Sequence, residues 1–256
     1  MCHYFQLFES VKSKLDLKLD QDIAGFETLQ SISSAPDFNY WMYKTIFPYL
    51  KGRVLELGSG IGNISDYIIK DFNDVTLSDY NSDYCLLLKN KYHSHTSVKQ
   101  INSLDLQDPQ FKIKNAHLKE SFDSIVLLNV IEHLQDDQLS VDYCHFLLKN
   151  DGHLILLAPA YQLLYSNLDR EIGHYRRYTS LSLTRLIQSD FKILRQQYFN
   201  FLGMTAWLIV NKILGRKKLS RNSMATFNKL VPVAKLLDKI IAFKAGVSII
   251  VVGQKK

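Results

Sequence analysis

The stretch VLELGSGIGN, residues 54–63, decides the fold, because it joins an apolar run to the closely spaced glycines Gly58, Gly60 and Gly62. Glycine tolerates positive φ angles and lets the backbone approach a ligand closely. The stretch therefore predicts a buried strand, a ligand-binding turn and the start of a helix. Its G-x-G-x-G spacing differs from the G-x-G-x-x-G pattern of dinucleotide sites. Glu56 also places an anion at the end of the strand, where it suits an ammonium group better than a pyrophosphate.

Short apolar runs and helical stretches alternate on the C-terminal side of this turn. Such alternation is typical of a largely parallel sheet covered by helices. We expect strands at 53–57, 74–79, 97–103, 122–130, 152–159, 191–199 and 246–256, and helices at 63–72, 82–92, 138–149 and 179–190. The pattern divides the chain into an N-terminal helical cap at 1–50 and a domain at 51–256, with a helical insertion at 200–245.

The composition is that of a globular chain of 256 residues, with 46% hydrophobic and 22% charged residues. The three cysteines, Cys2, Cys85 and Cys144, form no C-x-x-C pair, which argues against a disulfide framework and for a reducing compartment. The sequence shows no signal-peptide pattern and no run of about 18 apolar residues. We therefore expect a cytoplasmic protein, either free or at the membrane surface. The net charge of +6 is too modest to predict a nucleic-acid partner, and none is expected.

VLELGSGIG resembles motif I of the class I S-adenosylmethionine-dependent methyltransferases, and three further motifs follow at fitting distances. These motifs are VTLSDYN at 75–81, NSLDLQ at 102–107 and FDSIVLLNVIEHL at 122–134. The resemblance implies a Rossmann-like α/β fold, in which a doubly wound, seven-stranded mixed sheet follows a helical cap and a helical insertion precedes the last strand. It also implies S-adenosyl-L-methionine as the cofactor.

The resemblance assigns roles to individual residues of these motifs. It implies that Asp79 accepts hydrogen bonds from the ribose hydroxyls, that Tyr80 packs on the adenine, and that Asp105 accepts from the adenine amino group. Leu106 would lie beside the same ring, and Asn129 would face the sulfonium. The implied cofactor-binding set is completed by the residues of motif I, Glu56, Gly58, Ser59, Gly60, Gly62 and Asn63.

A second unusual stretch, GHYRRYTS at 173–180, follows the fifth expected strand. It resembles a subgroup of bacterial-type methyltransferases, some of which occur alongside polyprenyl-phosphate glycosyltransferases. The resemblance therefore implies a glycan or lipid-linked substrate. In this segment Arg176 and Arg177 are candidates for binding a phosphate or carboxylate, and Tyr175 and Tyr178 offer stacking faces.

A structural role is the alternative for this segment, with one arginine paired to Asp169 or Glu171 and the tyrosines packed. We prefer the binding role, because so many polar and aromatic groups are costly in a plain loop. His174 in the segment and His133 after the fourth strand are the candidate bases, since a hydroxyl or ammonium acceptor must lose a proton. Alternatively, His133 opens a helix beside the cofactor and orients the loop.

The run NVIEH at 129–133 raises the question of a metal ion. One RNA 2′-O-methyltransferase family binds a metal through a Glu-x-x-Glu-His pattern. The corresponding residues here are Asn129, Glu132 and His133, and asparagine is a poorer ligand than glutamate. No later histidine pair is evident in the sequence, so no metal site is predicted.

Residues 200–221 are expected to form an apolar helix that ends in a basic cluster of Arg216, Lys217, Lys218 and Arg221. Such a helix either covers the substrate or makes a peripheral contact with an anionic membrane. The predicted reaction is O-methylation of a small-molecule, glycan or lipid-linked acceptor by in-line displacement, with an anionic acceptor as one version. The alternatives are an RNA methyltransferase and a catalytically inactive cofactor-binding module.

Overall fold

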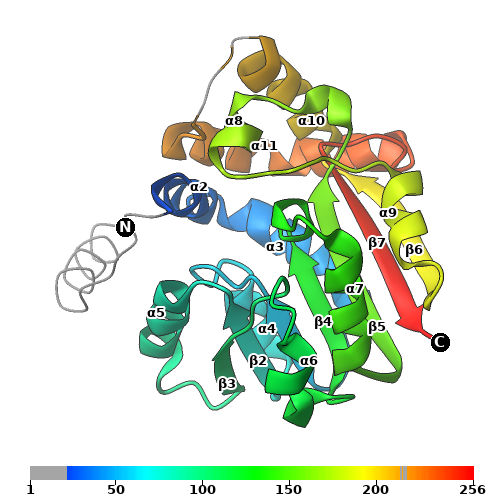
Figure 1. Ribbon diagram of the computed structural model, residues 1–256. Helices are drawn as coiled ribbons and strands as arrows, with labels where there is room; N and C mark the ends of the chain where they lie inside the picture. Colours follow the sequence, from blue (N-terminus) through cyan, green and yellow to red (C-terminus); the bar gives the residue numbers. More distant parts are fainter. Residues whose placement is uncertain (1–21, 214, 216–217) are drawn as a thin grey trace.

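The computed structural model describes residues 22–213, 215 and 218–256, and its centre is a seven-stranded sheet in the order β3-β2-β1-β4-β5-β7-β6 (Figure 1). The last strand runs antiparallel to both of its neighbours, β5 and β6, and the remaining pairs are parallel. The strands are β1 (Val54–Leu57), β2 (Val75–Asp79), β3 (Val98–Ser103), β4 (Phe122–Leu128), β5 (Leu148–Pro159), β6 (Phe191–Phe199) and β7 (Ser248–Lys255). This arrangement confirms the predicted doubly wound, seven-stranded mixed sheet.

Two apolar cores lie on opposite faces of the sheet. Side chains alternate along a strand, so Leu154 and Leu156 belong to one core, whereas Ile155 and Leu157 belong to the other. Because the central strands are buried on both faces, their sequences are continuous apolar runs rather than alternating patterns. The edge strand β6 is largely exposed, in agreement with its polar residues.

Helices cover both cores. The first core is closed by α6 (Phe111–Lys114), α7 (Asp137–Leu147) and α9 (Ser180–Ile187), and the second by α4 (Ser65–Asp71) and α5 (Ser82–Tyr92). Side-chain caps fix several starts: Asn81 accepts from the backbone of Asp83 at α5, and Thr179 accepts from the backbone of Ser182 at α9. The two cysteines in the described part, Cys85 and Cys144, are buried free thiols in these helices.

The N-terminal cap is described from residue 22 and contains α2 (Ile23–Ser33) and α3 (Pro36–Ile46). The part of the predicted cap at 1–21 lies outside the described residues. Trp41 and Ile46 of α3 pack into the same core as the strands β1 and β4. The helical cap is therefore present and shares a core with the sheet, and the predicted domain boundary at residue 50 stays a prediction.

The insertion before the last strand contains α10 (Phe201–Trp207), the π-helical turn η6 (Leu208–Ile213) and α11 (Arg221–Ile240). The prediction of one helix over 200–221 is therefore wrong. Gly215 adopts a φ of 66°, and the Ser220 hydroxyl accepts from the backbone of Ser223 to begin a new helix. The predicted basic residues Arg216 and Lys217 lie outside the described residues. Among the described helices, none is long and apolar enough to cross a membrane.

Candidate functional site

The turn after β1 carries the three glycines of the deciding stretch, and all three have positive φ angles: 75° at Gly58, 53° at Gly60 and 83° at Gly62. A Cβ atom at Gly58 would lie 2.3 Å from a methyl carbon of Val130. The turn therefore requires glycine both for its backbone conformation and for the close approach of the segment that follows β4. The Ser59 hydroxyl bonds within the same turn, since it donates to the Glu56 carbonyl and accepts from the Ser78 backbone.

Glu56 lies inside β1 and is buried, and its carboxylate accepts a short hydrogen bond from the Ser65 hydroxyl of α4. Desolvation raises the pKa of Glu56 to about 7, although the hydroxyl bond opposes the shift. A buried carboxylate of this kind is stabilised by a cationic partner. The contact of Glu56 with an ammonium group of the cofactor stays a prediction.

Asp79 ends β2 beside the same turn. Its carboxylate accepts from the Gly60 amide at 2.9 Å and from the Asn81 amide at 3.0 Å. Burial raises the pKa of Asp79 to about 6, while these two backbone bonds favour the charged form. Each carboxylate oxygen keeps a further lone pair, which is what acceptance from two ribose hydroxyls requires.

The other predicted cofactor residues follow neighbouring strands. Tyr80 is 67% exposed next to Asp79, and Asp105 lies exposed two residues beyond β3, where its carboxylate accepts from the Gln107 amide. Leu106 is buried, and Asn129 follows β4 with a φ of 56°. The structure thus brings all the predicted residues to the carboxyl edge of the first four strands, which is where ligands bind in open α/β sheets.

The cap helix α2 closes over the glycine turn. Asn63 donates from its amide to the Leu29 carbonyl at 3.0 Å, and a Cβ at Gly60 would meet the Leu29 side chain at 2.9 Å. Asp22, which caps α2, accepts from the Tyr84 hydroxyl of α5 at 2.8 Å. Asn63 therefore links the cap to the turn, a contact that sequence reasoning did not assign to it.

The segment GHYRRYTS docks on residues that follow β4. The Tyr175 amide donates to the Glu132 carbonyl at 2.8 Å, and Arg176 donates to the Asp137 carboxylate at 2.9 Å. The Tyr178 hydroxyl donates to the same Asp137 carboxylate at 2.8 Å. Tyr175 is 55% exposed and Arg176 is half-buried, so both side chains reach the surface.

Arg177 and Tyr178 were expected to contact a substrate, but the structure buries both side chains. The Arg177 guanidinium is buried and donates two bonds to Asp169, at 2.8 and 3.0 Å. Trp207 of α10 covers it, with the ring centre 4.5 Å from the guanidinium carbon. Tyr178 is likewise buried. Both side chains therefore hold the segment together, because their binding groups are already occupied and shielded from solvent.

His174 is almost fully buried, and Asp169 holds its orientation. The Nδ1 atom lies 2.8 Å from the Asp169 carboxylate, and the Nε2 atom lies 3.7 Å from the Glu132 carboxylate. Although burial alone would raise the pKa of Asp169, hydrogen bonds from His174 and Arg177 hold it well below its ordinary value. The His133 ring packs edge-on against His174, with centroids 4.5 Å apart. The two candidate bases are thus neighbours.

Burial shifts the pKa values of Glu132 and His133 in opposite directions. Burial raises the pKa of Glu132 to about 7, against the opposing attraction of His174. The His133 residue is exposed, but its ring is surrounded by protein atoms, and this desolvation, reinforced by the neighbouring His174, lowers the pKa of His133. His133 is therefore neutral at neutral pH, and its lowered pKa makes it a weak base.

The alternative reading of the segment named Asp169 as a partner for one arginine, and Arg177 makes this pair. Sequence reasoning missed the contacts of Asp169 and Glu132 with His174. The spacing of Ser166 and Asp169 was the available signal, since a serine followed three residues later by an acid is typical of a helix start. The structure has this capping box at α8 (Asn167–Glu171). It places Asp169 at the first turn of the helix, where it meets His174.

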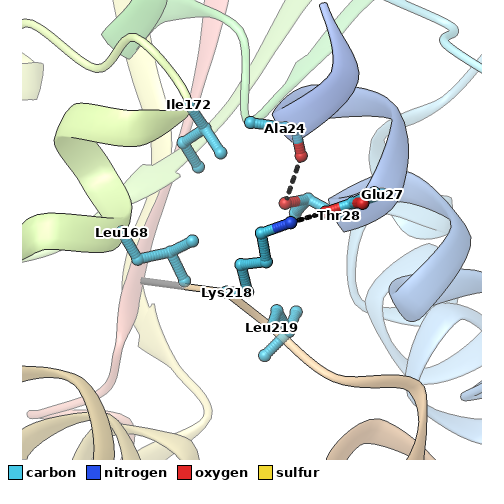
Figure 2. Close-up of a pocket in the computed structure, with 7 residues that line it drawn as sticks. All are labelled: Ala24, Glu27, Thr28, Leu168, Ile172, Lys218 and Leu219. Atoms are coloured by element: carbon cyan, nitrogen blue, oxygen red, sulfur yellow. Dashed lines mark hydrogen bonds and ion pairs between the residues drawn. The ribbon is translucent and has the colours of Figure 1, made fainter. Parts of the chain in front are cut away.

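A small pocket lies between the cap and α8 (Figure 2). Leu168 and Ile172 point into it from one side, and the helix α2 forms the opposite wall with Ala24 and Thr28. Lys218, paired with Glu27 at 2.8 Å, and Leu219 complete the lining. The pocket is mostly apolar, and its lining residue Ile172 lies two residues before His174 in the chain.

Comparison with known proteins agrees with this geometry. Residues 55–154 match the model of a family described as a methyltransferase domain. A probable polyketide synthase 40 from Dictyostelium discoideum is 24% identical over 171 residues, which cover 58% of this chain and 7% of the synthase. The chain spans between 5% and 8% of the length of the curated relatives it matches.

Solved structures share the fold. A SAM-dependent methyltransferase from Archaeoglobus fulgidus superposes with a TM-score of 0.56 at 14% identity, covering 85% of this chain and 94% of that one. Phosphoethanolamine N-methyltransferase 2 from Haemonchus contortus, in complex with S-adenosyl-L-methionine, has a TM-score of 0.56 at 15% identity, covering 85% and 52% of the two chains. Residues 55–154 thus match a methyltransferase domain, and the sheet shares its fold with these methyltransferase structures.

Proposed function

We propose that this chain transfers the methyl group of S-adenosylmethionine to an oxygen of an acceptor held beyond β4 and β5. The observation that carries the proposal is the pair of buried carboxylates, Glu56 and Asp79, on adjacent strands beside the glycine turn. They match an ammonium group and a ribose, which are the two polar ends that the cofactor presents near this turn. Binding the cofactor for methyl transfer would explain why two carboxylates are buried at this place.

The chemistry asks little of the protein beyond positioning. The sulfonium methyl is already electrophilic, so an in-line displacement needs an aligned acceptor and exclusion of water. A hydroxyl acceptor must also lose its proton. His133 is the accessible neutral base beside this edge, and His174, oriented by Asp169, lies against it.

Several contacts support a small, partly apolar or anionic acceptor. Tyr175 and Arg176 reach the surface next to the histidines, and the pocket between α2 and α8 is mainly apolar. Trp207 of α10 packs on Arg177, which supports a role of the insertion as a substrate lid. The membrane contact remains a second version, in which Lys218 and the start of α11 meet anionic lipid and a lipid-linked acceptor.

Calorimetry with S-adenosylmethionine and S-adenosylhomocysteine tests the proposal on the wild type and on Asp79→Ala. We expect micromolar binding, about 8 kcal/mol, in the wild type. Loss of two charge-assisted hydrogen bonds in Asp79→Ala should weaken it by about 100-fold. Asp142→Ala, which removes an exposed carboxylate of α7, is the matched control and should bind normally.

Turnover with a labelled methyl group then separates the alternatives. Transfer to a small molecule, glycan or lipid fraction supports the proposal. Transfer to RNA, with binding that weakens steeply as salt rises, would favour an RNA methyltransferase. Normal cofactor binding without transfer to any fraction would favour an interaction module, and no cofactor binding by the folded protein would overturn the proposal.

A further inference from the structure

Glu132 is a buried acid whose carboxylate accepts no hydrogen bond from the described residues. Its side chain is 0% exposed, and neither carboxylate oxygen has a hydrogen-bond partner among the described residues. Asp169 is equally buried, but its oxygens accept from Arg177, His174 and the Ser166 backbone and hydroxyl. A buried carboxylate that lacks such donors is costly, so an unsatisfied one calls for a ligand or a proton.

The neighbouring His174 presents a lone pair to this acid. Its Nδ1 atom is 2.8 Å from Asp169, whose charge is fixed by the buried Arg177, so the ring proton lies on Nδ1. The Nε2 atom then carries a lone pair and faces the Glu132 oxygen at 3.7 Å, which is longer than a hydrogen bond. Two electron-rich atoms facing each other repel unless a proton or a metal cation lies between them.

His133 supplies a third ligand atom from the solvent side. One ligand atom each of Glu132, His133 and His174 can be chosen so that all lie within 4.8 Å of one another. The His133 ring is exposed, which gives an ion a path to the buried acid. The cluster therefore combines an anionic ligand, two imidazoles and an entrance.

We propose that Glu132, His133 and His174 form a binding site for a divalent transition-metal ion, with zinc as the best match. Zinc bonds of about 2.0–2.1 Å in a tetrahedral site place ligand atoms about 3.3 Å apart. The 3.7 Å separation between His174 and Glu132 would close by a few tenths of an ångström, and the widest of the three, within 4.8 Å, by up to about 1.5 Å. Two imidazoles and one carboxylate suit zinc or iron, whereas magnesium and calcium prefer oxygen ligands.

The outer contacts of the cluster resemble those of established metal sites. A metal-bound histidine usually donates its other ring N–H to a carboxylate, which fixes the tautomer. Asp169 holds His174 in this way, and Arg177 holds Asp169. Three protein ligands leave a coordination position open, which is characteristic of reactive rather than purely structural zinc sites. The site would thus bind an oxygen of a second molecule at the carboxyl edge of the sheet.

The site does not depend on the proposed methyl transfer, because metal binding is measured without cofactor or acceptor. Its competitor is a doubly protonated His174 that bridges Asp169 and Glu132 with no metal. In that arrangement His133 has no part, so a variant at His133 separates the two. If the metal is present, both histidines act as ligands, and a metal-bound acceptor oxygen replaces a histidine base.

The test is a titration of the chelator-treated full-length protein with Zn²⁺ by calorimetry and with Co²⁺ by visible absorption. We expect one equivalent of each ion to bind, with Co²⁺ bands of a low-coordinate nitrogen and oxygen site. His133→Ala should weaken binding by at least 10-fold, and Glu132→Gln should do the same. His117→Ala, which removes an exposed histidine of the short helix η3 (Ala116–Leu118), outside the cluster, is the matched control and should bind as the wild type does.

Two outcomes would overturn the metal site. One is the absence of stoichiometric binding by the folded wild type. The other is binding that His133→Ala leaves unchanged, which would place the ion elsewhere. Because His133 is exposed, this variant should fold even if Glu132→Gln does not, and circular dichroism checks it. The cofactor calorimetry described above fails or succeeds independently of these results.

Discussion

The cofactor turn and the cluster around His174 lie on the same edge of one sheet, but they are built by opposite means. At the turn, glycine backbone and two carboxylates come from residues 56–79, and their bonds are mostly to nearby backbone amides. At the cluster, side chains bond to side chains, and residues 132 and 133 meet residues 169–177 across a long stretch of chain.

The two regions are therefore sensitive to different kinds of substitution. The turn depends on backbone conformation, so a single Cβ atom disrupts it. The cluster depends on charge balance, because Arg177, Asp169, His174 and Glu132 are buried together and each satisfies or strains its neighbour. Four experiments probe this contrast.

The largest effect is expected from Arg177→Met, which leaves the Asp169 carboxylate buried without its main partner. Removing one member of a buried ion pair lowers the free energy of unfolding by about 3–5 kcal/mol. Arg176→Met is the matched control, because its pair with Asp137 is partly exposed and contributes about 0.5 kcal/mol. Urea unfolding followed by circular dichroism measures the free energy of unfolding of both variants. Equal losses would show that stability depends no more on Arg177 than on Arg176.

Gly58→Ala and Gly173→Ala compare glycines of the two regions. Both have positive φ angles, 75° and 79°, but a Cβ at Gly58 overlaps Val130, whereas one at Gly173 meets only His133 at 4.0 Å. Backbone strain alone lowers the free energy of unfolding by about 1 kcal/mol, and the overlap adds about 1–2 kcal/mol. Thermal unfolding with and without cofactor is the measurement. A larger loss at Gly173 would contradict the close approach at the turn.

Glu56→Gln should stabilise the cofactor-free protein and weaken cofactor binding. The folded state raises the pKa of Glu56 from 4.5 to about 7, so ionisation of this group opposes folding. The penalty is absent below pH 4.5, grows as the pH rises to about 7, and is constant above it. The substitution should therefore add about 3 kcal/mol to the free energy of unfolding at pH 8 and little at pH 4.5. A gain that is the same at both pH values would refute the buried charge as its cause.

The smallest effect on stability is expected from Tyr175→Ala. The ring is 55% exposed, so the free energy of unfolding should change by less than about 0.5 kcal/mol. If the ring contacts the acceptor, kcat/KM falls by about tenfold, the equivalent of 1.4 kcal/mol, while cofactor affinity is kept. Steady-state kinetics on the acceptor found with labelled methyl groups is the check. Unchanged kcat/KM would remove Tyr175 from the predicted substrate contacts.

The cofactor half was predictable because its information is local. Gly58, Glu56 and Asp79 belong to strand ends, and parallel strands bring their carboxyl ends to one edge whatever the rest of the chain does. Even here one role escaped the sequence, since Asn63 bonds to the cap helix through a contact that spans 34 residues. The likeness to a GHYRRYT subgroup and the cytoplasmic location stay predictions.

The acceptor half was predicted in composition but not in roles. The sequence singled out the stretch at 173–180, yet it could not tell which arginine faces solvent. That depends on Asp169, which enters the core at α8, and on Trp207, which covers Arg177 from the insertion. The expected single helix at 200–221 failed for a similar reason, because an apolar run does not reveal where Ser220 begins a new helix.

By itself, then, the sequence determined the α/β sheet, the glycine turn and the carboxylates beside it, because periodicity and backbone constraints act over a few residues. Only the tertiary structure decided that Arg177 is a buried partner and that His174 meets Glu132 and His133. Burial and pairing of charges depend on distant segments packing together, and the energy of a charged side chain is set by those neighbours rather than by its place in the chain.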